Sequence, residues 1–229
     1  NNVDPWSHFV NVFMLDKDGN RIDRRNAQDI VVPLYNHQIP PGAGQTVHYE
    51  LKLPKNLSAP VTVEVKLLYR KFDTTYMQFV AKTTDKLGIP LRGHKPGTQY
   101  KNSLPIVELA RDEVTFAIEG VDQVVKNETP DIPVWQRWND YGIGLLLKPR
   151  RNEIRYASDA FREVHKLGRY DGKLNLARAL LSEGFVDEAV DAINQAAEFK
   201  NPAAPKWTLD WLKGLANLKQ NRLLEAEQN

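Results

Sequence analysis

The chain has 229 residues, 41% of them hydrophobic and 26% charged, a balance typical of a folded globular protein. Its net charge of +2 comes from 31 basic and 29 acidic residues without a long run of one sign, which argues against nucleic-acid binding. No apolar segment approaches membrane-spanning length, and the lack of cysteine excludes disulfides, thiolate zinc sites and a covalently attached c-type haem.

The N-terminal half carries the two-residue period of β-strands. The alternation is clearest where Val61, Val63 and Val65 interleave with Thr62 and Glu64. Turn-forming Gly, Pro, Asn and Asp separate it from the other strand-like stretches, which are residues 7–15, 21–35, 46–54, 104–110 and 113–120. This pattern predicts an immunoglobulin-like antiparallel β-sandwich over residues 1–127.

Residues 82–102 follow neither the strand nor the helix period, so we expect a long surface loop within this domain. Loops of that length are uncommon and are often functional. Directly before it, residues 69–77 bring together basic and acidic side chains, among them Arg70 and Asp73. We interpret this stretch as a strand end with a local Arg–Asp pair, and anion binding is the alternative.

The period changes to about 3.6 residues after a linker at 128–133, which predicts helices over 134–229. Three similar motifs recur there, each with a Gly or Asn for a turn five residues before an Ala: NEIRYA at 152–157, GFVDEA at 184–189 and NRLLEA at 221–226. Phe161 and Ile193 lie four residues after their Ala and are predicted to fill the space between helix layers.

This pattern resembles the tetratricopeptide repeat, a helix–turn–helix unit of about 34 residues. Small residues at Ala177 and Gly214 are predicted to let the first helix of a pair approach its neighbour closely. The third repeat stops three residues into its second helix, and we expect truncation, disorder beyond Asn229 or a covering partner there. The predicted interaction residues of the repeats are Trp138, Tyr141, Ala177 and Gly214.

The N-terminal half contains residues suited to two kinds of site. Asp16, Asp18, Asn20 and Asp23 are spaced in a way similar to a calcium loop, but Gly19 follows Asp18 directly and no closing Glu is present. The favoured interpretation is a hairpin turn with Asp-Gly as the turn pair.

The second kind of site involves the five histidines, which show no close metal-ligand spacing. His48 and His165 are expected to be structural or exposed, and His94 belongs to the long loop. His8 and His37 lie beside aromatic, Pro or Asn residues. Each is predicted either to satisfy a structural corner or to act as an axial ligand to a haem held by a partner domain.

Much of the chain resembles one known arrangement. The stretches DPWSHFVNVFML, VEVKLLYRKFDTTYM and PVWQRWNDYGIGLLL, with the residues around them, resemble the C-terminal region of large multihaem c-type cytochromes that carry tetratricopeptide repeats. The likeness excludes residues 82–102. In that family a haem-rich domain with Cys-x-x-Cys-His motifs precedes a β-sandwich and helical repeats. This chain has no such motif, so any haem c implied by the resemblance belongs to a partner or an upstream domain.

The resemblance implies a non-catalytic accessory or scaffold module of an extracytoplasmic, periplasmic or extracellular, electron-transfer assembly. The partners it implies are a multihaem cytochrome domain or subunit and another protein bound by the repeats, without nucleic acid or a membrane span. An adaptor unrelated to haem is the alternative. We expect no enzymatic activity because no catalytic constellation is visible.

Overall fold

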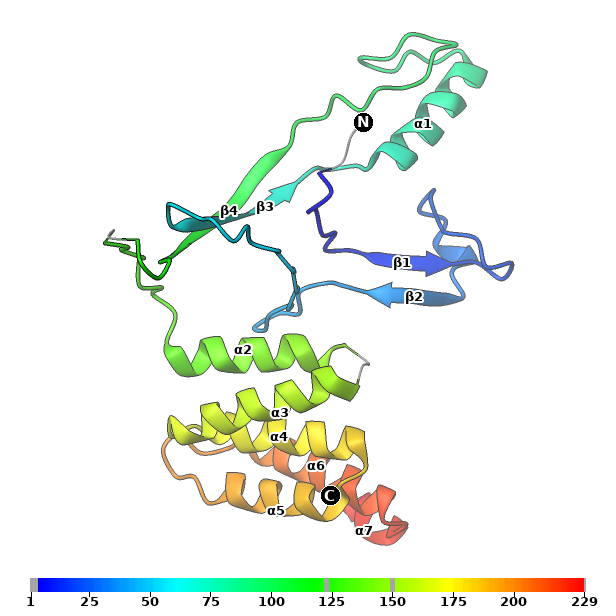
Figure 1. Ribbon diagram of the computed structural model, residues 1–229. Helices are drawn as coiled ribbons and strands as arrows, with labels where there is room; N and C mark the ends of the chain where they lie inside the picture. Colours follow the sequence, from blue (N-terminus) through cyan, green and yellow to red (C-terminus); the bar gives the residue numbers. More distant parts are fainter. Residues whose placement is uncertain (1–3, 122–123, 149–150, 229) are drawn as a thin grey trace. The chain divides into compact units, whose positions relative to one another are not determined.

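The computed structural model describes residues 4–121, 124–148 and 151–228 (Figure 1). Short antiparallel strands come first and a stack of helices follows, as the sequence predicted. The chain forms two compact units. The helical unit begins at Pro130 and also takes in two N-terminal segments, 4–10 and 37–49. The second unit holds the strands and the first helix.

The strands form two small sheets, so the predicted sandwich is wrong. β1 (Val12–Leu15) pairs with β2 (Val32–Asn36), and β3 (Val61–Tyr69) pairs with β4 (Val107–Phe116), both antiparallel. Neither sheet has a third strand among the described residues. The stretch 46–54, also expected as a strand, forms no ladder. Alternation predicts an extended backbone, but a sheet also requires a partner strand whose position the local pattern does not specify.

The first helix, α1 (Thr74–Leu87), corrects two expectations: the strand end at 69–77 and the start of the loop at 82–102. Asp73 caps the helix, because its carboxylate accepts a hydrogen bond of 2.7 Å from the backbone N–H of Tyr76. Gly88 ends the helix in the left-handed conformation, with φ of 65°. Asp73 therefore acts as a helix cap here.

The turn at 16–20 is confirmed as a turn. The carboxylate of Asp16 accepts hydrogen bonds from the backbone N–H groups of Asp18, at 2.9 Å, and Asn20, at 2.8 Å. Gly19 has φ of 77°, a conformation that favours glycine. The acidic side chain is thus used to close the turn.

Helices α2–α7 make up the helical stack (Figure 1). Their bounds are α2 Val134–Leu146, α3 Arg151–Lys166, α4 Tyr170–Glu183, α5 Val186–Ala197, α6 Lys206–Lys219 and α7 Leu223–Gln228. In the part of the chain that the structure describes, no helix has both the length and the apolar character needed to cross a membrane.

Most of the repeat pattern is confirmed as helical packing. Gly184 and Asn221 take the turns with positive φ, while Asn152 lies inside α3 and does not form a turn. Phe161 and Ile193 are both fully buried between helices. The stack is therefore confirmed, and its assignment to the tetratricopeptide class stays a prediction.

The N-terminal segment 37–49 belongs to the helical unit because glycines let it lie directly on α2. A Cβ atom added at Gly144 would come within 2.4 Å of Thr46 Oγ1 and 2.6 Å of its backbone nitrogen. The Thr46 hydroxyl donates a hydrogen bond of 3.1 Å to the carbonyl oxygen of Tyr141. His48 Nε2 lies 3.3 Å from a carboxylate oxygen of Glu153 on α3.

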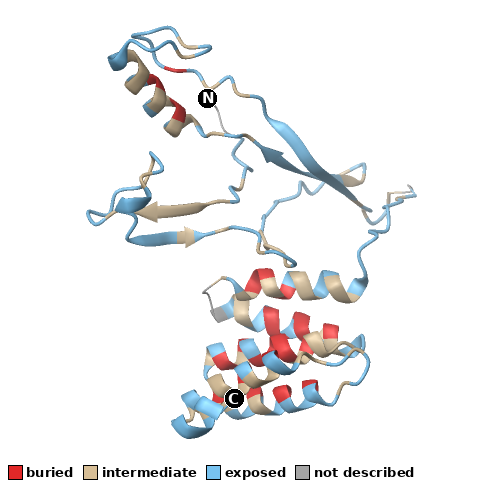
Figure 2. Ribbon diagram, turned by 180° about the vertical axis from the view of Figure 1, so that it is seen from behind, coloured by how far each residue is buried: buried red, intermediate tan, exposed pale blue. Residues whose placement is uncertain are grey.

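Buried residues gather in the helical stack and on α1 (Figure 2). One cluster joins α4, α5 and α6, and a second joins α2, α3 and α4 around Phe161 and Leu145. A third, smaller cluster packs Met77 and Ala81 of α1 against Tyr100 of the following loop. The strands β3 and β4, in contrast, are almost entirely exposed (Figure 2).

Candidate functional site

The structure brings the two predicted haem-ligand candidates together. The rings of His8 and His37 stack with centroids 4.9 Å apart and an angle of 27° between their planes. Both residues lie in the N-terminal segments that belong to the helical unit, and both are half-buried. Twenty-eight residues separate them in the sequence, so the spacing gave no signal of their contact.

His8 is held in an environment that favours its neutral form. Its Nε2 atom is buried and has no hydrogen-bond partner. Burial lowers the pKa of His8, and the nearby charges of His37 and Lys148 lower that pKa further. The imidazole therefore stays neutral at pH values where an exposed histidine is already partly protonated.

The stacked pair does not fit the two axial positions of one haem. An imidazole binds iron through a nitrogen lone pair that lies in the plane of its ring, and two axial ligands approach the metal from opposite sides. In this stack the rings face each other, so their nitrogens do not converge on a common point. A single ligand role for His37 stays a prediction.

The lowered pKa of His8 predicts a pH dependence of stability. The folded protein binds the His8 proton more weakly than the unfolded chain does, so the free energy of unfolding falls as pH drops from about 6.5 toward the lowered pKa. We expect His8→Gln to reduce this loss. Urea denaturation at a series of pH values measures the free energy of unfolding of both proteins. The same fall of this free energy with pH in both would contradict the buried environment of His8.

The four predicted interaction residues have different surroundings. Trp138 and Tyr141 are partly exposed on α2 and make an edge contact, with ring centroids 6.2 Å apart. Ala177 is fully buried inside the stack, so it contacts neighbouring helices and is not accessible to a partner. Gly214 lies half-buried on α6. Only part of the predicted set therefore lies at the surface.

No layer of the described residues covers the more apolar face of the β3–β4 ribbon. This face is the clearest candidate interaction surface of its unit. The register pairs Val61 with Phe116 and Val63 with Val114 on one face, and Val65 lies opposite Asp112 at the next position of that face. Exposed fractions on this face are 40% for Val63, 58% for Val65 and 55% for Phe116. We call it the ribbon face.

The opposite face of the ribbon is polar. The register pairs Thr62 with Thr115 and Lys66 with Arg111 there, and the two threonine hydroxyls lie 2.9 Å apart. Glu64 on the same face forms ion pairs with Lys66 and Arg111. The two faces thus differ in the manner of a sheet with one side packed on a core.

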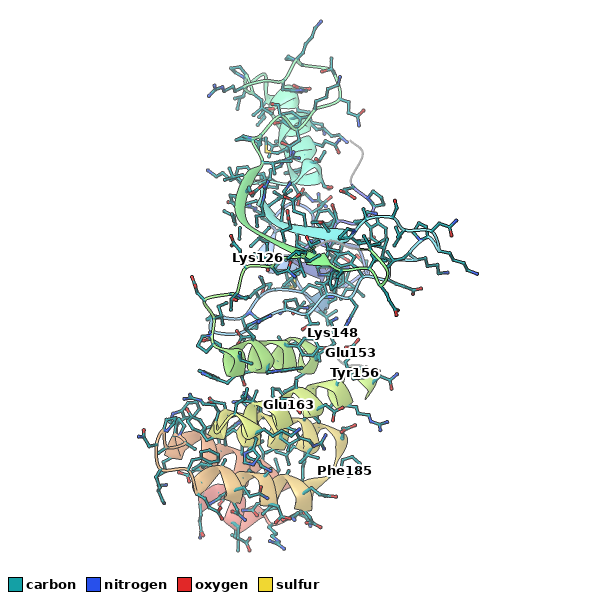
Figure 3. The ribbon with its side chains drawn as sticks, turned by 60° about the vertical axis from the view of Figure 1, so that its left-hand side comes forward. Lys126, Lys148, Glu153, Tyr156, Glu163 and Phe185 are labelled. Atoms are coloured by element: carbon teal, nitrogen blue, oxygen red, sulfur yellow. The ribbon has the colours of Figure 1, made fainter. Side chains whose placement is uncertain are left out.

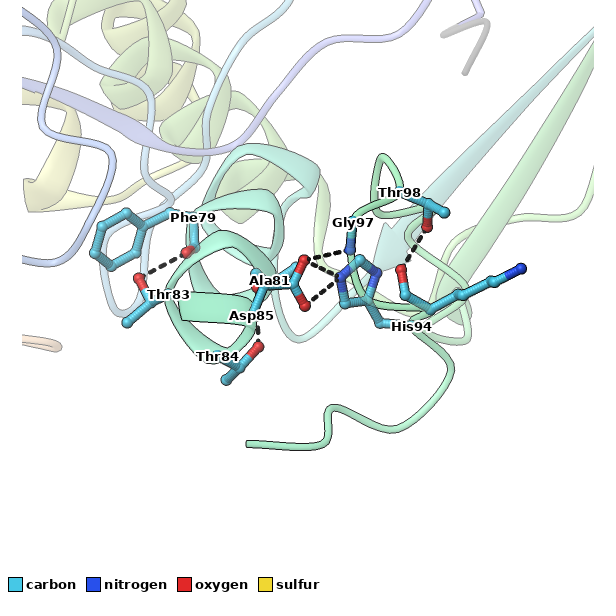
Figure 4. Close-up of polar contacts among 9 residues, drawn as sticks. Phe79, Ala81, Thr83, Thr84, Asp85, His94, Gly97 and Thr98 are labelled. Carbon is cyan, nitrogen blue, oxygen red and sulfur yellow. Dashed lines mark hydrogen bonds and ion pairs between the residues drawn. The ribbon is translucent and has the colours of Figure 1, made fainter. Parts of the chain in front are cut away.

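A polar network that sequence analysis missed holds the loop after α1 (Figure 4). Both carboxylate oxygens of Asp85 lie within hydrogen-bond distance of His94 Nε2, at 3.0 and 3.1 Å, and Asp85 also accepts from the backbone N–H of Gly97 at 3.0 Å. The His94 side chain is 2% exposed. The Gly97 hydrogen bond and then the His94 hydrogen bond lower the pKa of Asp85.

This network has a structural role. It ties the loop to the last turn of α1, next to the cluster of Met77, Ala81 and Tyr100. The aspartate and histidine are nine residues apart in the sequence, and a loop without periodicity gave no reason to pair them.

A pocket in the helical unit lies between the first turns of α3 and the turn that follows α4, and Phe185 of its lining is labelled in Figure 3. Its lining residues are Asn152, Arg155, Glu183 and Phe185. This lining carries an arginine and a glutamate but no nucleophile–base pair of the kind used in hydrolysis. Across the described residues, no group of three or more histidine, aspartate or glutamate side chains is placed to hold a metal ion.

The comparisons with known proteins found no matching family model, no matching curated protein and no matching solved structure.

Proposed function

We propose that this chain is a non-catalytic scaffold module that contacts another protein, and that its partner is a multihaem c-type cytochrome domain or subunit in an extracytoplasmic compartment. The observation that carries the scaffold role is the exposed ribbon face. The cytochrome partner rests on the resemblance of the chain's sequence to the C-terminal region of such cytochromes.

The ribbon face favours a partner for an energetic reason. A two-stranded ribbon is marginally stable in water unless its apolar face packs against another layer. Contiguous apolar patches on a protein surface usually mark contacts with other molecules. Here Val63, Val65 and Phe116 are all open to solvent, and burying them would be favourable by about 25 cal/mol for each Å² removed from water.

Haem enters this proposal only through the partner. The chain contains no cysteine and therefore holds no haem c through thioether bonds. A scaffold that packs against a haem domain would supply apolar cover and fixed geometry. Electron transfer itself would occur between the haems of the partner.

Copurification tests the scaffold role and the haem partner together. A tagged full chain is isolated from its native cells, and we expect a Soret band to copurify. Val63→Lys is expected to reduce the haem recovered per chain about tenfold or more, because a charge in an apolar interface costs several kcal/mol of desolvation. Val63 pairs with Val114 across the ribbon, so the new lysine has no acidic residue directly opposite it. Val63 is 40% exposed, so the lysine can reach water when no partner is bound.

Thr62→Lys is the matched control, since it adds the same charge to the polar face of the ribbon. It is expected to copurify haem as the unchanged chain does. Circular dichroism checks that both variants stay folded. Isolation of a defined complex without a Soret band would refute the cytochrome setting and favour the adaptor alternative. Equal recovery with Val63→Lys would refute the role of the ribbon face.

A further inference from the structure

Three aromatic rings line one side of α1 and of the residues just before it. Phe72, Tyr76 and Phe79 follow the spacing i, i+4, i+7, which places side chains along one side of a helix. The rings of Phe72 and Tyr76 are in contact, with centroids 5.2 Å apart. None of the three side chains is fully buried. We call these residues the aromatic row.

Positive charges from two distant parts of the chain lie over this row. The guanidinium carbon of Arg25 lies 4.7 Å from the ring centroid of Phe72 and 4.8 Å from that of Tyr76. The ammonium nitrogen of Lys71 lies 5.4 Å from the Phe72 centroid. The guanidinium carbon of Arg24 lies 5.6 Å from the centroid of the third ring. We call Arg24, Arg25 and Lys71 the cationic surface, and all three are exposed.

The carboxylates nearest to this surface in the sequence are engaged elsewhere or neutralise only one of its charges. Asp73 caps α1 and does not pair with Arg70, whose side chain forms no ion pair or hydrogen bond in the described part of the chain. Asp29 accepts a hydrogen bond from a neighbouring asparagine side chain. Asp23 pairs with Arg24 at 3.1 Å. The other two cations of the surface have no carboxylate partner among the described residues.

We infer that the cationic surface is a docking site for an acidic peptide segment of a partner protein. Guanidinium and ammonium groups bind carboxylates through charge-assisted hydrogen bonds. An aromatic ring beneath a cation holds the cation in place without neutralising its charge. The carboxylates of an acidic segment would therefore meet positive charges that are already positioned.

Two observations narrow the kind of partner. A single-stranded nucleic acid is disfavoured, because cations cover ring faces of the aromatic row on which bases would stack. The surface and the row lie within residues 24–79, away from both ends of the chain, so the surface is not open because an element stops at a chain end. The inference depends neither on the ribbon face nor on the cytochrome setting.

Fluorescence anisotropy of a labelled peptide tests this inference. A fluorescein-labelled peptide of about eight glutamates is titrated with the full chain at about 50 mM NaCl, where surface charges are screened less than at physiological salt. We expect saturable binding that weakens as salt is added. Arg25→Gln and Lys71→Gln are each expected to raise the dissociation constant about threefold or more, and the double variant about tenfold.

Lys126→Gln is the matched control, because it also removes one exposed positive charge from this unit. Lys126, labelled in Figure 3, precedes Asn127, whose side chain bonds the backbone of Thr115 at the end of the ribbon away from α1. The control is expected to bind the peptide as the unchanged chain does, and circular dichroism checks that every variant stays folded.

Three results would overturn the inference. The first is the absence of saturable binding of the glutamate peptide. The second is an affinity of Arg25→Gln and Lys71→Gln equal to that of the unchanged chain, or an equal loss of affinity in Lys126→Gln. The third is tighter binding of a labelled oligothymidylate of the same length, which would favour a nucleic acid as the occupant.

Discussion

Phe161→Ala is expected to lower the free energy of unfolding of the helical unit by about 3–5 kcal/mol, the usual cost of removing a fully buried phenylalanine ring. Phe161 is 0% exposed and packs with Leu145 and Leu176, so it joins α2, α3 and α4. A Cβ atom added at Gly142 would lie 2.5 Å from its ring. The ring therefore fills the space that Gly142 leaves open, and its loss creates a cavity.

Urea denaturation of the full chain, followed by far-UV circular dichroism, measures this loss. Tyr156→Ala is the matched control, because Tyr156 lies on the same helix and is 57% exposed; Figure 3 labels it. Its expected change is within about 0.5 kcal/mol. Comparable losses for the two variants would contradict the packing of α3 described above.

Gly172→Ala is expected to reduce the same free energy by about 2 kcal/mol. A Cβ atom there would come within 2.4 Å of the backbone nitrogen of His165 and 2.6 Å of the carbonyl oxygen of Phe161. Both neighbours are backbone atoms of α3, so α4 must move away to relieve the clash. Overpacking costs about 3 kcal/mol at the upper end of its usual range, and the better helix propensity of alanine returns about 1 kcal/mol.

Ser182→Ala is the control for this second prediction, because Ser182 is exposed on the same helix as Gly172. The free energy of unfolding of this control is expected to change by no more than about 0.5 kcal/mol. Only Gly172→Ala should therefore lower the urea midpoint clearly. A midpoint for Gly172→Ala equal to or above that of the unchanged chain would rule out the close approach of α3 and α4.

The helical unit was largely predictable because helix formation depends on residues three and four positions apart. The motif at 184–189 correctly located the turn at Gly184 and the buried Ile193. The motif at 152–157 predicted a turn at Asn152 incorrectly, because Asn152 lies in α3. The burial predicted from this motif is correct for Ala157 and Phe161. The local hydrophobic period therefore predicted the helices correctly, whereas the positions of individual turns were predicted less well.

The N-terminal half was less predictable because sheets form between distant segments. The alternation at Val61–Tyr69 correctly predicted β3, but its partner lies at Val107–Phe116, beyond α1 and a loop. The same kind of alternation at 46–54 gave no strand, because the start of that stretch lies on α2. A two-residue period thus predicts an extended segment with one apolar face. It does not predict which segment packs against that face.

The sequence by itself determined the absence of covalently bound haem c, the order of strands before helices, and the small residues that allow helices to pack closely. These properties depend on composition and on spacing within a few residues. Only the tertiary structure decided that His8 stacks on His37, that Asp85 holds His94, and that Val63 and Phe116 of the ribbon face are exposed. Each of these depends on which distant segments approach one another, and local spacing does not specify that.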